Sequence, residues 1–320
     1  MASPIRSKTR AKQPGFEACS GCSLCLLGCP VWRQKRDLRH TPQGRAKALQ
    51  NGSGADEIAA SVDMCTLCGS CEPSCPENMA LIDMIHSLRQ DRPLGRTRVE
   101  AMLAQVQPAS AAATSGTVLI ANAALRVTPE RIERIRNYLG SASLAADDGA
   151  DIALAIETGV PVPQERKARF IAALGGATRI VVADGGFVRT LRAWLSGRAV
   201  EALGAALSGL PAVRSRLKSD DLYVIEARGF HADWSRLLPH YDGLLAAAGC
   251  AMNLDLQRCA VATTASSAQN VLGLQGIDAR EQARWILEGR SPARIVVEDA
   301  ADIGVFSGVT DCPVVHIADL

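Results

Sequence analysis

The sequence has few of the features that mark a nucleic-acid binder, a membrane protein or an exported protein. Aromatic residues make up only 4% of its 320 residues and the formal net charge is +2, which indicates neither base stacking nor a basic nucleic-acid surface. No apolar run approaches the roughly 18 residues of a membrane span. Residues 1–16 lack the apolar stretch of a signal peptide. We therefore expect a cytoplasmic protein with no nucleic-acid partner and no transmembrane segment. Any association with the inner membrane would be peripheral and would depend on a partner.

Cysteine, in contrast, is abundant, and it is concentrated near the N-terminus. Eight of the 11 cysteines form two copies of one pattern, Cys-x-x-Cys-x-x-Cys-x-x-x-Cys-Pro. The first copy is Cys19, Cys22, Cys25 and Cys29, followed by Pro30, and the second is Cys65, Cys68, Cys71 and Cys75, followed by Pro76. This is the spacing of a bacterial ferredoxin run, which holds [4Fe–4S] clusters through thiolates. The sequence therefore predicts two [4Fe–4S] clusters as cofactors.

The predicted ligand sets cross between the two runs, because the fourth cysteine of such a run ligates the other cluster in two-cluster proteins. Two-residue gaps allow a tight turn to bring three sulfurs onto three corners of one cube. Gly21 and Gly69 lie beside the ligands, where the backbone must pass close to sulfide, and amides there and at Ser70 are expected hydrogen-bond donors. We expect cluster 1 on Cys19, Cys22, Cys25 and Cys75, and cluster 2 on Cys65, Cys68, Cys71 and Cys29. No residue is assigned a catalytic role.

Zinc sites, disulfides and structural thiols each account for the cysteine pattern less well. Structural zinc pairs two separate Cys-x₂₋₄-Cys units across a longer loop, whereas here three cysteines fall within seven residues, twice. Disulfides would need an oxidising compartment, which nothing in the sequence indicates. Eight buried structural thiols in this register by chance are implausible.

The region around the runs is predicted to be a helical dicluster domain, residues 17–95, preceded by a basic tail at 1–16 and followed by a linker at 96–116. Residues 30–64 separate the runs, which is too many for the short-strand scaffold of a minimal ferredoxin. Thr41 and Pro42 are a typical N-cap and first helical residue. Residues 79–89 are apolar at helical spacing and should pack under the clusters.

From residue 117 the pattern changes to alternating strands and helices, which predicts mostly parallel sheets. We expect strands at 118–121, 152–156, 179–184, 222–225 and 314–317, and helices at 129–139, 164–174 and 185–194. Segment 169–184 resembles segment 284–299 in a single register without a gap, so we infer a duplication into units 117–215 and 220–320. The expected fold class is α+β overall, an α-helical ferredoxin followed by a duplicated α/β domain.

Together, the cysteine runs, the step Thr41-Pro42-Gln43-Gly44-Arg45 and the α/β tail resemble one group of iron–sulfur subunits. The group contains the glycolate oxidase iron–sulfur subunit, the anaerobic glycerol-3-phosphate dehydrogenase C subunit and the heterodisulfide reductase B and C subunits. The resemblance implies an electron-transfer subunit of an oxidoreductase (dehydrogenase) complex, itself non-catalytic. It would relay single electrons between a partner subunit that carries FAD or FMN and an acceptor. The acceptor would be a quinone or another group, such as one in a membrane-associated subunit.

The tail departs from this group, whose corresponding domains carry cysteine-rich signatures. Unit 117–215 has no cysteine, and unit 220–320 keeps only Cys250, Cys259 and Cys312. Scattered thiols of this kind are most often buried core residues. We therefore expect a structural or docking tail rather than a catalytic one.

Two further functions are compatible with the same residues. The clusters could gate partner binding in a redox or iron sensor, or the tail could act through Cys250 and Cys259 in a self-contained, heterodisulfide-reductase-like enzyme. Arg45 and the basic segment 33–39 are expected to raise cluster potentials or bind an acidic partner, or else to form a solvated basic face.

Overall fold

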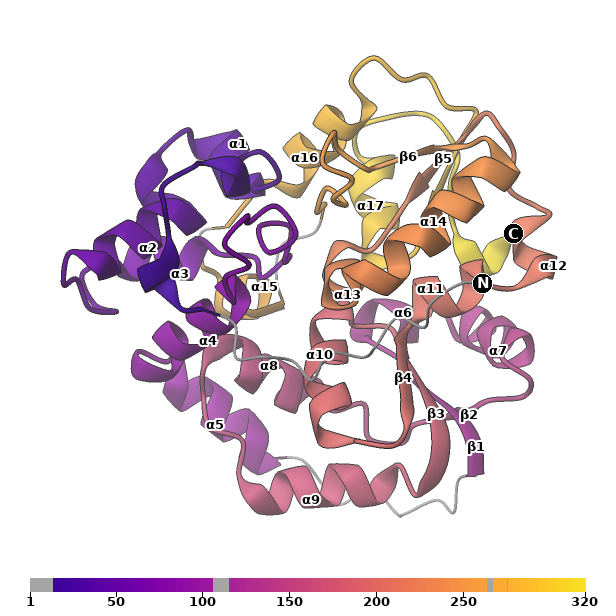
Figure 1. The fold of residues 1–320 in the computed structure, drawn as a ribbon. Helices are drawn as coiled ribbons and strands as arrows, with labels where there is room; N and C mark the ends of the chain where they lie inside the picture. Colours follow the sequence, from indigo (N-terminus) through magenta and orange to yellow (C-terminus); the bar gives the residue numbers. More distant parts are fainter. Residues whose placement is uncertain (1–13, 106–114, 264–266, 275) are drawn as a thin grey trace, which may run out of the picture.

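The computed structural model of the chain describes residues 14–105, 115–263, 267–274 and 276–320. Figure 1 shows an N-terminal helical part, residues 14–105, beside two units that each contain a sheet. Most of the predicted basic tail, residues 1–13, and residues 106–114 of the predicted linker lie outside the described residues.

Short helices form the N-terminal helical part around the two cysteine runs. Thr41 begins α2 as predicted, because its hydroxyl accepts a hydrogen bond from the amide of Gly44 at 3.0 Å. The amphipathic segment forms α4, and its apolar side chains, among them Leu81 and Ile85, are buried. The helices are η1 (Phe16–Ala18), η2 (Leu24–Leu26), α1 (Pro30–Lys35), η3 (Leu38–His40), α2 (Pro42–Gln50), α3 (Ala59–Met64), α4 (Leu81–Asp91) and α5 (Arg96–Gln105).

Part of the segment predicted as a linker is packed helix. Residues 96–105 form α5, and its Val99 and Leu103 are buried against α8. Val99, Met102 and Leu103 have the spacing of one face of a helix, which explains why this segment packs as one.

The first unit is built on a parallel sheet in the order β2-β1-β3-β4. Helices 129–139, 164–174 and 185–194 are found close to their predicted positions, as α7, α9 and α10. The elements are β1 (Ser115–Ile120), α6 (Ala123–Arg126), α7 (Pro129–Tyr138), β2 (Ser143–Leu144), α8 (Ala150–Thr158), α9 (Gln164–Ala173), β3 (Gly176–Val182), α10 (Gly185–Trp194), β4 (Ala199–Ala202), α11 (Leu203–Ser208) and α12 (Pro211–Arg214).

The strand predicted at 152–156 is wrong, because these residues lie in helix α8. Gly149 and Gly159, both at positive φ, bracket this helix. Ile152, Leu154 and Ala155 are all buried because α8 packs against α4, α5 and α10. A short apolar run that is buried on several sides has no period that distinguishes helix from strand.

The second unit has a parallel sheet of the same form, in the order β6-β5-β7-β8. β3 and β7, which lie within the two similar sequence segments, hold equivalent places in their sheets. The elements are β5 (Asp221–Val224), α13 (Ala227–Ala232), α14 (Trp234–Ala248), β6 (Ala251–Met252), α15 (Ser267–Leu272), α16 (Ala279–Leu287), β7 (Arg294–Val297), α17 (Ala301–Ser307), β8 (Val314–His316) and η4 (Ile317–Asp319).

One hydrophobic core joins the two units. Alternate strand residues point to opposite faces of a sheet, so Leu119 and Val181 of the first sheet and Tyr223 and Val296 of the second meet in one cluster. The other faces pack separately beneath α9 and α10 and beneath α16 and α17. Cys68 of the second cysteine run also belongs to the joint core, so the tail is packed directly against the cysteine part.

Among the helices that the structure describes, none is both long enough and apolar enough to cross a membrane.

Candidate iron–sulfur site

The first predicted ligand set lines one small cavity. The turns η1 and η2 present the first three cysteines of run one, and the second run contributes its last cysteine to the same space. The four ligand-forming residues around this cavity are Cys19, Cys22, Cys25 and Cys75. The side chain of Cys22 is exposed, so this site lies at the surface of the protein.

Three thiols of the second predicted set, those of Cys29, Cys68 and Cys71, are buried, and that of Cys65 is partly exposed. Cys29 immediately precedes α1, and it lies close enough to Cys68 and Cys65 for their charges to act on its thiol. Burial first, and the neighbouring thiol of Cys68 second, raise the pKa of Cys29 to about 11. Burial and the same neighbours raise the pKa of Cys71 well above its usual range. Cys29 therefore lies with the second run, although it belongs to the first in sequence.

These thiols have the chemistry of cluster ligands. Burial raises the pKa of Cys25 to about 12, so a metal must replace the proton if a buried thiolate is to form. No three His, Cys, Asp or Glu side chains within the described ranges converge closely enough to hold one metal ion. A cubane needs its four thiolates at separate corners around a larger space, so the donor set fits a [4Fe–4S] cluster better than a single zinc ion.

Gly21 and Gly69 adopt the left-handed conformation that favours glycine, with φ of +86° and +81°. The Gln43 amide donates to the carbonyl of Gly21 at 3.2 Å, and Lys47 Nζ donates to the carbonyl of Cys19 at 2.8 Å. These two hydrogen bonds to the first cysteine run were not predicted from the sequence. The only indication of them there is that Gln43 belongs to the segment 41–45, which was singled out.

Arg45 is a buried link between helices and does not belong to a solvated basic face. It is 2% exposed, and its guanidinium donates to the carbonyl of His40 at 2.9 Å and to the carbonyl of Ser61 at 2.7 Å. It thus joins α2 to η3 and α3.

The basic segment 33–39 is divided between the interior and the surface. Arg33 lies over the ring of Trp285 in α16, 3.4 Å from its centroid, and so helps to hold the second unit. Arg36 and Arg39 remain exposed.

Two of the three tail thiols lie in the core, as expected. Cys250 and Cys259 are buried, whereas Cys312 is partly exposed. The sulfur of Cys259 lies 3.6 Å from the carbonyl oxygen of Ser70, inside the second cysteine run. This contact helps to seat the run on the tail.

The family model described as a 4Fe-4S dicluster domain matches residues 15–79. The chain is an iron–sulfur protein. The matched range contains both cysteine runs, and a dicluster domain of this kind indicates electron transfer. A search of the curated proteins found no match, and neither did a search of the solved structures.

Proposed function

We propose that this iron–sulfur protein is a non-catalytic electron-transfer subunit of a multi-subunit oxidoreductase. It relays single electrons between a flavoprotein, carrying FAD or FMN, and a quinone or other acceptor. The observation that carries this proposal is the presence of two sets of cysteines, one at the surface and one mostly buried. Both lie within the range that matches a dicluster domain. When bound, two [4Fe–4S] clusters would supply one-electron oxidation and reduction.

The ligand sets follow the same grouping. We assign cluster 1 to Cys19, Cys22, Cys25 and Cys75, and cluster 2 to Cys65, Cys68, Cys71 and Cys29. The cavity lined by the first set supports this assignment, and so does the proximity of Cys29 to the second run.

The exposed end of the relay is the face that a protein partner would cover. Leu24 and Leu27 flank Cys25, and their side chains are 41% and 55% exposed close to the exposed Cys22. Apolar side chains around a surface ligand suit a redox partner that must bring its own cofactor close. The chain would work in the cytoplasm and reach the inner membrane only through such a partner.

The tail, residues 115–320, covers the second cysteine run and has no catalytic role. Its two units have the same strand order, and we propose that they arose by duplication. Their joint core contacts Cys68, so they shield the second cluster from water.

The proposal is tested on anaerobically prepared protein by counting iron and sulfide, and by identifying the subunit and flavin that copurify. Wild-type protein should contain about eight iron and eight sulfide per chain. Zinc in place of iron would refute the cofactor assignment. Clusters that are never reduced during turnover of a copurifying flavoprotein would refute the relay.

Single substitutions test the crossed ligands. Cys75→Ala should remove the surface cluster, which oxidants reach first, while Cys29→Ala should remove the slowly oxidised, buried one. Each variant should keep about half of the iron, and Cys312→Ala is the matched control that should keep all of it. If Cys29→Ala removed the rapidly oxidised cluster instead, the ligand sets would not cross.

A further inference from the structure

A large cavity lies beside the second cysteine run. Its volume is about 810 Å³, within the range of small-molecule sites in proteins. Helices α4, α8, α9, α10 and α13 surround it, and Leu67 and Gly69 of the second cysteine run form part of its wall. It also includes Asp184 and Gly185, which follow the carboxyl end of β3, the edge at which parallel sheets usually bind ligands.

His231 connects this cavity to a predicted cluster ligand. Its side chain lines the cavity and is 5% exposed, and its Nδ1 lies 2.7 Å from the carbonyl oxygen of Cys68. A carbonyl oxygen only accepts, so Nδ1 carries the proton and Nε2 keeps a lone pair. Nε2 is buried and has no hydrogen-bond partner in the described part of the chain. A buried acceptor of this kind needs a donor, and no described protein group supplies one.

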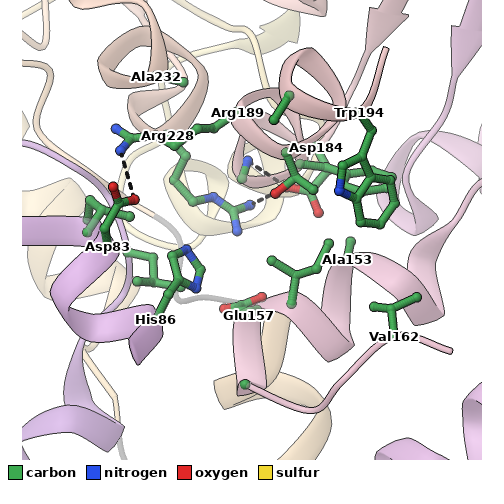
Figure 2. Close-up of a pocket in the computed structure, with 18 of the residues that line it drawn as sticks. Asp83, His86, Ala153, Glu157, Val162, Asp184, Arg189, Trp194, Arg228 and Ala232 are labelled. Atoms are coloured by element: carbon green, nitrogen blue, oxygen red, sulfur yellow. Dashed lines mark hydrogen bonds and ion pairs between the residues drawn. The ribbon is translucent and has the colours of Figure 1, made fainter. Parts of the chain in front are cut away.

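The charged groups of the cavity neutralise one another. Figure 2 shows Arg228 reaching Asp184, and Arg189 reaching Asp83, across the cavity wall. The carboxylate of Asp184 also accepts from the amide of Gly186 at 2.9 Å, and so occupies the start of α10 where an anion would otherwise bind. Glu157 and Lys167 add one further group of each sign, so the lining carries no excess charge. These contacts favour an uncharged occupant.

Part of the remaining wall is apolar and aromatic, although Gln90, Gln164 and Thr190 also line it. Ile82, Val160 and Val162 line it, together with Trp194. The Nζ atom of Lys167 lies over the Trp194 ring, 4.5 Å from its centroid. Trp194 offers the surface on which a flat ring packs, since aromatic rings gain from stacked or edge contacts.

We propose that this cavity binds an uncharged aromatic alcohol whose hydroxyl donates a hydrogen bond to Nε2 of His231. The alcohol would then sit against the loop of the second cluster, separated from the Cys68 carbonyl by one imidazole ring. A role for this alcohol in the electron relay rests on the proposed function. Its binding to the cavity does not require electron transfer.

Isothermal titration of the anaerobically prepared full-length protein tests the proposal with three probes of similar shape. 2-Naphthol has the donor, 2-methoxynaphthalene lacks it, and 2-naphthoate carries a negative charge. We expect 2-naphthol to bind about tenfold more tightly than 2-methoxynaphthalene, the value of one hydrogen bond that satisfies a buried acceptor. No binding of 2-naphthol, equal binding of it and 2-methoxynaphthalene, or tighter binding of 2-naphthoate would overturn the proposal.

Two variants locate the binding. His231→Phe should weaken 2-naphthol to the level of 2-methoxynaphthalene and leave the latter unchanged. Ala193→Trp, at an exposed position of α10 that lines the cavity, should abolish binding of both without touching His231. This second variant decides the matter if His231→Phe does not fold, and undiminished binding in it would overturn the proposal. Protein that assembles both clusters but fails these titrations contradicts this inference alone, whereas protein without clusters contradicts the proposed function.

Discussion

Replacing Gly44 with alanine should destabilise the N-terminal helical part, although the same change stabilises most helices. Gly44 lies inside α2, where alanine is normally favoured by about 1 kcal/mol. Here a Cβ would overlap the carbonyl oxygen of Leu38 and would lie 2.8 Å from its carbonyl carbon. Real Cβ atoms essentially never approach other heavy atoms closer than 3.0 Å. Helix α2 would therefore have to move away from η3.

The cost of this movement follows from the contacts around the Leu38 carbonyl. The same oxygen accepts from the hydroxyl of Thr41 at 2.7 Å, and that hydroxyl caps α2 through the amide of Gly44. Overpacking costs about 1–3 kcal/mol and a lost cap about 1 kcal/mol, so we expect a net loss of about 2 kcal/mol after the helix gain is subtracted.

Gly243→Ala is the matched control for this prediction. Gly243 is an exposed position inside α14, and a Cβ there meets nothing within 4 Å. This variant should gain about 0.5–1 kcal/mol. Both are measured by anaerobic urea unfolding, followed by circular dichroism and by cluster absorbance. If Gly44→Ala is as stable as Gly243→Ala, the close packing of α2 on η3 is not what requires glycine.

Two further predictions concern buried charge. Burial raises the pKa of Glu298 from 4.5 to about 7, so the folded protein holds this proton more tightly than the unfolded chain does. Its contribution to stability is therefore complete below about pH 4.5 and falls by about 3 kcal/mol as the pH rises through 7. In Glu298→Gln, the urea midpoint should change less with pH between about pH 4.5 and 7 than it does in the wild-type protein. An unchanged pH dependence would contradict the raised pKa of Glu298. Arg166→Met should cost about 3–5 kcal/mol in urea unfolding, because it leaves the buried carboxylates of Asp147 and Asp151 without their partner. A loss below 1 kcal/mol would show that these groups are hydrated.

The parts of the fold that depend on neighbouring residues could be predicted from the sequence. Thr41 and Pro42 begin a helix because a cap is a local interaction. The strand around Ile180 and the helix from Gln164 follow from runs whose flanks contain clear turn signals. The cysteine spacing is local in the same sense, which is why the dicluster match coincides with the two runs.

The remaining features depend on contacts between distant residues. The helix at 150–158 looks like a strand in sequence because four other helices, α4, α5, α10 and α15, pack against it. Arg45 looks like a surface charge until Ser61 and the His40 carbonyl enclose it. The bond between His231 and Cys68 joins residues 163 positions apart, so no motif announces it. The cavity beside it is formed by five helices from three parts of the chain.

The loop between Cys65 and Cys75 faces the tail through Cys68, Gly69 and Ser70. A Cβ at Gly69 would lie only 2.8 Å from the Cβ of His231, so this surface tolerates little displacement. We therefore expect a displacement of this loop to displace the tail with it. Protein prepared without iron should therefore be cleaved by an added protease between Cys65 and Cys75 sooner than protein that contains its clusters.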